Sequence, residues 1–201
     1  MMKLPAAIVH DTFLGPLVKR FGAPDIFSSP KSRGVFQALV RSIVYQQLSG
    51  KAAATIHGRF RNLFPRKNIT PERVLALAEA ELRAVGLSRA KAEYVRNLAQ
   101  KFFDGSIPYR RFPKLASDRI IDHLVSVKGI GEWTVHMFLI FTLQRLDILP
   151  TGDLGIRKGF QKLYKLKSLP SPAEMQKLAT PWRAYASIAA WYLWRLADEG
   201  K

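Results

Sequence analysis

The chain has 201 residues, 48% of them hydrophobic, and carries 32 Lys and Arg against 15 Asp and Glu, which gives a formal charge of +17. This length and composition suit one globular domain, or one domain made of two lobes, and the charge indicates a polyanionic partner. The absence of cysteine excludes disulfides, thiolate zinc sites, iron–sulfur clusters and a cysteine nucleophile.

Nucleic acid is the usual partner of so basic a chain, an anionic membrane surface is the rival, and a basic face that contacts only water is the third interpretation. The four histidines show no metal-ligand spacing. The longest apolar stretch, 135–143, is too short to cross a bilayer, and the first ten residues lack a cleavage-site pattern. We therefore expect an intracellular protein, cytoplasmic or nuclear, without a membrane segment.

Hydrophobic residues recur with a helical period along nearly the whole chain, and no segment alternates as a strand would. Ser or Thr often stands where a helix N-cap is expected, and Pro71 follows one such residue at the first helical position. The pattern predicts an all-α fold of about nine or ten helices, with one continuous helix over 70–82. The expected helices begin near Val35, Ser49, Thr70, Ser88, Ser117, Glu132, Asp153, Ser171 and Thr180.

A short turn with two glycines, 128–131, joins two of these helices. Glycine permits positive φ and lets another backbone approach closely. The amides that follow the turn form a helix N-terminus, which attracts a phosphate through its unpaired N–H groups and its dipole. Such a turn would anchor a sugar–phosphate chain without reading a base. An ordinary corner between two packed helices explains the same glycines.

The surrounding residues resemble the helix–hairpin–helix superfamily of DNA glycosylases. The matching segments are LVSVKGIGEWTVHMFLIFTL and DILPTGDLGIRKGF, and the likeness extends over roughly 35–195. Within the superfamily the chain is most similar to the 3-methyladenine DNA glycosylase II group, which removes alkylated purines. The resemblance implies one glycosylase domain over 1–201, with two helical lobes around a DNA-binding cleft. The middle lobe would span about 33–105, and the N-terminal segment would pack with a C-terminal lobe, 106–201.

Asp153 lies about twenty residues beyond the turn, at the position of the catalytic carboxylate of the superfamily. From spacing alone it is equally a helix N-cap, and the two roles are compatible because a helix N-terminus favours an anion. Cleavage of an N-glycosidic bond builds positive charge on the sugar, which a fixed carboxylate stabilises. The same carboxylate could orient or deprotonate water, and the sequence does not separate these roles.

Trp133 stands two places after the second glycine, where bifunctional members of the superfamily have a lysine nucleophile. The resemblance therefore implies hydrolysis by water and no strand cleavage. It also places Trp133 and Trp191 as walls of a base pocket, where a cationic alkylpurine would stack on an indole. A tryptophan buried in the core explains Trp133 as well. Met137 stands where a close relative has tyrosine, which leaves the shape of the pocket open.

The segment YQQLSGKAA lies in a turn between two helices, and the resemblance implies that Gln47 or Leu48 enters the DNA to fill the space of the flipped nucleotide. Capping of the preceding helix is the alternative for Gln46 and Gln47. No cofactor is required, but the resemblance implies one Na+ or K+ at the hairpin, held by the carbonyls of Val125, Val127 and Ile130. The further DNA contacts that we expect come from Lys51, Lys128, Gly129, Ile130, Gly131, Arg157 and Lys158.

The sequence thus favours a monofunctional glycosylase that excises alkylated purines such as 3-methyladenine. The expected partner is double-stranded DNA with damaged bases, and neither a membrane nor a second subunit is expected. Two alternatives stay open: a non-catalytic protein of the same fold that recognises DNA lesions, and a glycosylase for hypoxanthine or uracil. The residue set of Asp153, Trp133 and Trp191 favours an enzyme, because a pure binder does not need it.

Overall fold

The structure, a computed structural model, describes residues 3–25 and 34–199. Within these ranges the chain forms twelve α-helices, three short 3-10 helices and no strand, which confirms the all-α prediction. None of the helices in the described part is long and apolar enough to cross a membrane. The number of helices exceeds the prediction, partly because two short helices near the N-terminus, α1 (Ala6–Val9) and α2 (Leu14–Phe21), were not expected.

The chain divides into two compact units. Unit 1 comprises Met1–Pro30 and Leu139–Lys201, and unit 2 comprises Lys31–Phe138. The N-terminal segment therefore groups with the C-terminal part of the chain. The division differs from the predicted lobes in one respect, since the segment 106–138 belongs to unit 2.

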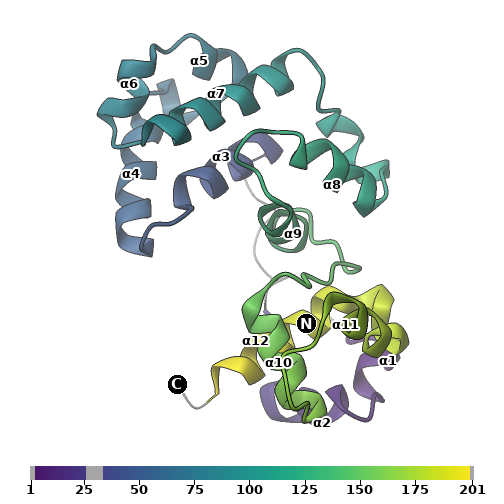
Figure 1. Ribbon diagram of the computed structural model, residues 1–201. Coiled ribbons are helices and arrows are strands. Elements are labelled where there is room, and N and C mark those ends of the chain that lie inside the picture. The colour runs from purple at the N-terminus through teal and green to yellow at the C-terminus, as the bar shows by residue number, and fades with distance from the viewer. Residues whose placement is uncertain (1–2, 26–33, 200–201) are drawn as a thin grey trace. The chain divides into compact units, whose positions relative to one another are not determined.

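Unit 2 is built around α3, which packs against α4 and α7, while α5 and α6 pack against α7. Figure 1 shows these helices in blue and teal. Its core is formed by fully buried side chains such as Leu39, Phe60 and Leu98. The helices are α3 (Val35–Tyr45), α4 (Gly50–Asn62), α5 (Pro71–Leu75), α6 (Glu79–Ala84), α7 (Arg89–Phe103), α8 (Ser117–Val125) and most of α9 (Glu132–Phe141).

The predicted helix over 70–82 is wrong as a single element, because α5 ends at Leu75 and α6 begins at Glu79. The backbone of Ala78 is extended, and its N–H donates to the Glu81 carboxylate at 2.8 Å. The Arg96 guanidinium donates to the Leu77 carbonyl at 2.6 Å. These two side chains satisfy the backbone groups that the break leaves without helical partners.

The segment 106–138 packs against the rest of unit 2 through contacts with α7. The Tyr109 ring stacks on Phe102 with the ring centroids 5.0 Å apart. The backbone N–H of Lys128 donates to the side chain of Asn97 at 3.0 Å. Sequence periodicity did not reveal these contacts, because they join residues on separate helices and turns.

Unit 1 has α12 (Ala186–Asp198) at its centre, packed mainly against α10 (Leu154–Tyr164) and also against α2. The close approach of α10 requires Gly159, because a Cβ there would lie 2.5 Å from the Leu193 carbonyl oxygen. Trp182 and Tyr192 are the largest fully buried side chains. The unit is completed by α1 and α11 (Pro172–Leu178).

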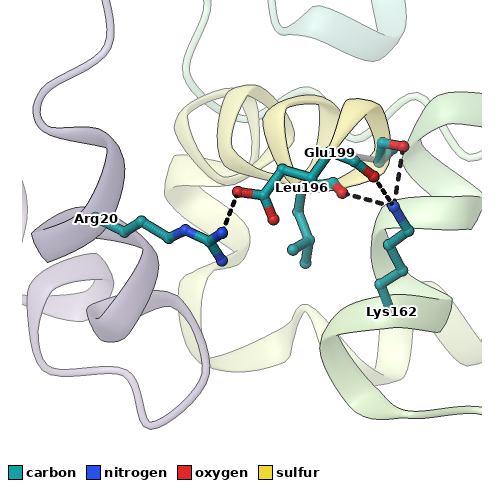
Figure 2. A network of polar contacts seen from close by, with 5 residues as sticks. Arg20, Lys162, Leu196 and Glu199 are labelled. Carbon is teal, nitrogen blue, oxygen red and sulfur yellow. Dashed lines mark hydrogen bonds and ion pairs between the residues drawn. The ribbon is translucent and has the colours of Figure 1, made fainter. Parts of the chain in front are cut away.

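The C-terminal end of α12 is closed by a lysine from α10. The Lys162 ammonium donates to the carbonyls of Leu196 (3.1 Å), Ala197 (3.2 Å) and Glu199 (2.8 Å). The Glu199 carboxylate in turn pairs with Arg20 of α2 at 2.6 Å. Figure 2 shows this network, which links three helices of unit 1 through the carbonyl groups that a helix end leaves unpaired.

Candidate active site and nucleic-acid interface

Asp153 is the N-cap of α10, as its position before an amphipathic run predicts. Its Oδ1 atom accepts hydrogen bonds from the backbone N–H of Ile156 and from the indole N–H of Trp194, both at 2.9 Å. The side chain is half-buried. Two donors from different elements hold this carboxyl group in one orientation, at the positive end of the α10 dipole.

Trp194 is the residue of this site whose contact with Asp153 was not predicted from the sequence. It belongs to α12 and reaches Asp153 because Gly155 has no side chain. A Cβ on Gly155 would lie 2.9 Å from Cδ1 of Trp194 and 3.0 Å from Oδ1 of Asp153. The indole also stacks on Phe141, with the ring centroids 5.9 Å apart and 22° between the planes. Gly155, two residues after Asp153, was the one local signal of a close neighbour.

Trp191, one turn before Trp194, lies in the core of unit 1 with only 7% of its surface exposed. Its ring meets Tyr192 edge-on, and the Arg195 guanidinium lies 4.9 Å from its ring centroid. The structure therefore shows Trp191 packed as a core residue of unit 1. Its use as a wall of a base pocket stays a prediction.

Trp133 is exposed to solvent, unlike the buried Trp191. It lies in the first turn of α9 and is 52% exposed, which is unusual for so large an apolar side chain. Met137 follows one turn later and is partly buried. An exposed indole at the start of a helix provides a flat surface on which a planar ring can stack.

The turn between α8 and α9 has the geometry that its glycines predict. Gly129 has a φ of +84°, and a Cβ on it would overlap the ring of Tyr94 from α7. Ile130 is buried and anchors the turn, while Gly131 is exposed with nothing within 4 Å of its Cβ direction. The turn thus presents the N-terminal amides of α9 beside Gly131, where no other side chain fills the space.

Lys128 is the first residue of the turn and pairs with Glu93 of α7, with Nζ and Oε1 2.6 Å apart. The hydrogen bond and the charge of Glu93 raise the pKa of Lys128 above its ordinary value. This lysine therefore stays protonated, but any phosphate that it binds must compete with Glu93.

The loop between α3 and α4 is attached to the same turn. The amide of Gln46 donates to the Gly129 carbonyl at 2.9 Å. The Lys91 ammonium donates to the carbonyls of Val44 (2.7 Å) and Gln46 (2.6 Å), and burial lowers the pKa of this lysine. Gln46 is therefore a structural link between the loop and the turn.

Gln47 and Leu48, the two residues predicted to enter the DNA, are both exposed, Leu48 by 39% of its surface. Gln47 has a φ of +54°, a left-handed conformation that costs a non-glycine residue about 1 kcal/mol or more. Such a conformation persists only where the surroundings impose it, and the fixed Gln46 on one side provides such a constraint.

The remaining predicted DNA contacts are distributed over both units. Lys51 is exposed in the first turn of α4 in unit 2, and Lys158 is exposed on α10 in unit 1. Arg157 is partly buried, and its Nε–H donates to the Pro170 carbonyl at 3.2 Å. One of the guanidinium donors is thus used inside the protein.

Comparison with known proteins decides the family. Residues 40–184 match the family described as HhH-GPD superfamily base excision DNA repair protein. The chain belongs to this superfamily. It is 34% identical to DNA-3-methyladenine glycosylase 1 of Schizosaccharomyces pombe over 194 residues, which cover 92% of this chain and 83% of the relative.

Two solved structures show how closely this HhH-GPD chain follows its relatives. The S. pombe 3-methyladenine DNA glycosylase in complex with abasic DNA matches with a TM-score of 0.77 and 32% identity, covering 94% of this chain and 93% of that one. The DNA-3-methyladenine glycosidase of Bacillus halodurans matches with a TM-score of 0.80 and 30% identity, covering 95% and 91%. The resemblance inferred from the two sequence segments is thereby confirmed.

The monovalent cation predicted at the hairpin of this HhH-GPD chain stays a prediction. Val125 is the last residue of α8, where helix carbonyls lack intrahelical partners. The Val127 carbonyl accepts the N–H of Ile130 at 3.0 Å and retains a second lone pair. Among the described residues no group of three His, Asp or Glu side chains could hold a metal ion.

Proposed function

We propose that the protein is a monofunctional DNA glycosylase of base excision repair. It binds double-stranded DNA, flips an alkylated purine such as 3-methyladenine out of the helix and hydrolyses its N-glycosidic bond. The names of the relatives support the substrate class. The observation that carries the proposal is the carboxyl group of Asp153, held by Ile156 and Trp194 at the N-terminus of α10.

Asp153 acts on the sugar. As the bond to the base breaks, positive charge develops on the deoxyribose, as in other glycoside hydrolysis. A carboxylate that is already oriented stabilises this charge without reorganisation at the moment of reaction. The Trp194 indole holds the carboxylate from a second helix, so the orientation does not depend on α10 alone.

Trp133 contributes to the selection of the base and to the type of reaction. A cationic alkylpurine gains ~0.5–2 kcal/mol by cation–π attraction to an indole, which a neutral purine lacks. An alkylated purine also leaves as a neutral base, so no second carboxyl group is needed to protonate it. Because residue 133 is not a lysine, no amine is present there to form a Schiff base, and no strand cleavage follows.

The DNA is held by the hairpin amides of 129–131 and by the basic side chains of Lys51, Lys128, Arg157 and Lys158. Na+ or K+ bound to the carbonyls of Val125, Val127 and Ile130 would supply positive charge next to a phosphate. Gln47 or Leu48 enters the space of the flipped nucleotide, since Gln46 is engaged with Gly129. The protein acts as a monomer on chromosomal DNA, in the cytoplasm or the nucleus.

Replacement of the carboxylate tests this proposal. Asp153→Asn keeps the size of the side chain and removes its charge, so we expect base release to fall at least about 100-fold while duplex binding persists. Trp194→Phe removes one hydrogen bond to Asp153, and we expect a smaller loss of kcat, about tenfold. The assay scores free base and abasic sites from duplexes that contain methylated adenine, hypoxanthine or uracil.

Asp147→Asn is the matched control, because Asp147 is an exposed acid of the same unit, and its activity should equal that of the wild type. Full activity of Asp153→Asn would refute the catalytic assignment. Release of hypoxanthine or uracil in preference to methylated adenine would refute the substrate class. Cleavage of the strand by the pure protein would refute the monofunctional assignment.

A further inference from the structure

The segment that forms α3 and α4 has an unusual distribution of charge. Between Asp25 and Glu72 the sequence contains eight Lys and Arg and no Asp or Glu. The two helices pack against each other, so their basic side chains share one part of unit 2. No acidic residue on either helix compensates this charge.

Two arginines of these helices lie on either side of a histidine. On α3, the Arg41 guanidinium lies 3.9 Å from the ring centroid of Tyr45, which is one turn further along the helix. The Tyr45 ring meets the His57 ring of α4 edge-on, with the centroids 5.9 Å apart. Arg61 follows His57 by one turn of α4, on the same face of that helix.

The positive charges of this Arg41–His57–Arg61 cluster have no carboxylate partner within the described part of the chain. The ion pairs found there involve other cations, namely Arg20, Arg119, Lys128 and His136. Burial, followed by the charges of Arg41 and Arg61, lowers the pKa of His57 to about 4. Because the imidazole is neutral at physiological pH, it has one N–H to donate while it does not add to the repulsion.

An anion next to this cluster would be attracted by both guanidinium groups. The guanidinium of Arg41 is held on the Tyr45 ring by cation–π contact, which leaves the N–H groups at its edge to bind a ligand. Arginine pairs with phosphate oxygens through two parallel hydrogen bonds, and a negative charge would remove the mutual repulsion of the two guanidinium groups. The donors of this cluster are of the types that bind a phosphate group.

We propose that Arg41, His57 and Arg61 form a phosphate-binding site, with a phosphate of the DNA backbone as the expected ligand. The choice of DNA as the source rests on the proposed function. Along the helices, the cluster lies roughly 8–18 Å from the loop at Gln47, given a rise of 1.5 Å per residue. At 3.4 Å per nucleotide, the phosphate would belong to a nucleotide about two to five positions from the flipped base.

The titration of His57 gives a direct test. NMR would follow the His57 imidazole in the free protein, with pyrophosphate and with an undamaged duplex. A bound phosphate places negative charge beside the ring, so we expect the pKa to rise by about 1 unit or more with the duplex. The duplex contains no lesion, so this result does not depend on base release.

Charge-removing variants give the second test. Arg41→Gln combined with Arg61→Gln should weaken duplex binding roughly tenfold at low salt, from the loss of two charged donors. The plot of log K against log salt concentration should become shallower by about 1, because one phosphate contact is lost. Arg41→Lys combined with Arg61→Lys keeps both charges and should retain the slope of log K against log salt concentration that the wild type shows. Circular dichroism of each variant would confirm that it is folded.

Arg110→Gln combined with Arg111→Gln is the matched control, since it removes the same charge from unit 2 and Arg110 also lies over a tyrosine ring, 5.6 Å from its centroid. An equal loss in this control would mean that only net charge matters and would overturn the site. An unchanged His57 pKa with both ligands would also overturn it. A rise with pyrophosphate alone would support the phosphate site and assign it to a free phosphate compound. If the wild type released no base but the duplex shifted His57, the proposed function would fail and this site would stand.

Discussion

At the scale of single residues, two glycines of the site leave space that the side chains of other helices occupy. Gly129 admits the ring of Tyr94, and Gly155 admits the indole of Trp194 beside Asp153. The sequence indicated Gly129, because it lies in a recognisable turn, and made no prediction about Gly155. It did not indicate their neighbours, since Tyr94 and Trp194 are far away in the chain and reach these positions only through tertiary packing.

For Asp153, too, the sequence indicated the residue but not its neighbours in the fold. Its position before an amphipathic run predicted an N-cap, and the structure shows the expected bond to Ile156. The second bond, from Trp194, joins residues on two helices that only the fold brings together. A carboxylate could therefore be located from the sequence, whereas the group that orients it could not.

Gly129→Ala should destabilise the protein by roughly 2–4 kcal/mol, since a Cβ would force the Tyr94 ring to move and φ is in the left-handed region. Urea unfolding would measure the change. Gly131→Ala is the control, because a Cβ there meets nothing within 4 Å, and its cost should stay near ~0.5 kcal/mol. Equal effects in the two variants would contradict this account.

At the scale of helices, the periodicity of apolar residues located most elements but not all of their ends. The predicted helix over 70–82 continued through Ala76–Ala78, because no glycine or proline marks a break there. The break exists because Glu81 and Arg96 satisfy the exposed backbone groups. Glu81 is a local signal three residues beyond Ala78, whereas Arg96 belongs to a different helix.

The end of α12 provides a prediction at this scale. Lys162→Met keeps the length of the side chain and removes its three hydrogen bonds to the carbonyls at the helix end (Figure 2). We expect a loss of about 1 kcal/mol in the free energy of unfolding, because these bonds are partly exposed to water. Lys167→Met is the matched control, since this exposed lysine follows α10. A loss as large in the control would show that the contacts of Lys162 contribute nothing specific.

At the scale of the whole molecule, the charge of +17 predicted a polyanionic partner, and membership of a DNA-repair superfamily agrees with it. Total charge does not say where on the surface the charge is concentrated. The concentration in α3 and α4 became meaningful only when the fold brought Tyr45, which carries Arg41, against His57 of α4. The assignment of 106–138 to unit 2 was also beyond the sequence, since the contacts of this segment with α7 involve no repeated pattern.

The stability of the folded chain should depend on pH through His57. Its pKa is about 4 when folded and about 6.5 when unfolded, so between these values only the unfolded chain binds the proton. Stability should therefore fall as pH decreases from 6.5 to 4, and His57 should contribute nothing to this dependence above pH 6.5. Replacement of His57 by Gln removes the contribution, so the urea midpoint of that variant should decrease less between pH 7 and pH 4.5. Arg41→Gln removes one charge that disfavours protonation of His57, so the decrease of its urea midpoint should lie between those of the wild type and of His57→Gln. Identical pH profiles for all three proteins would contradict the lowered pKa of His57.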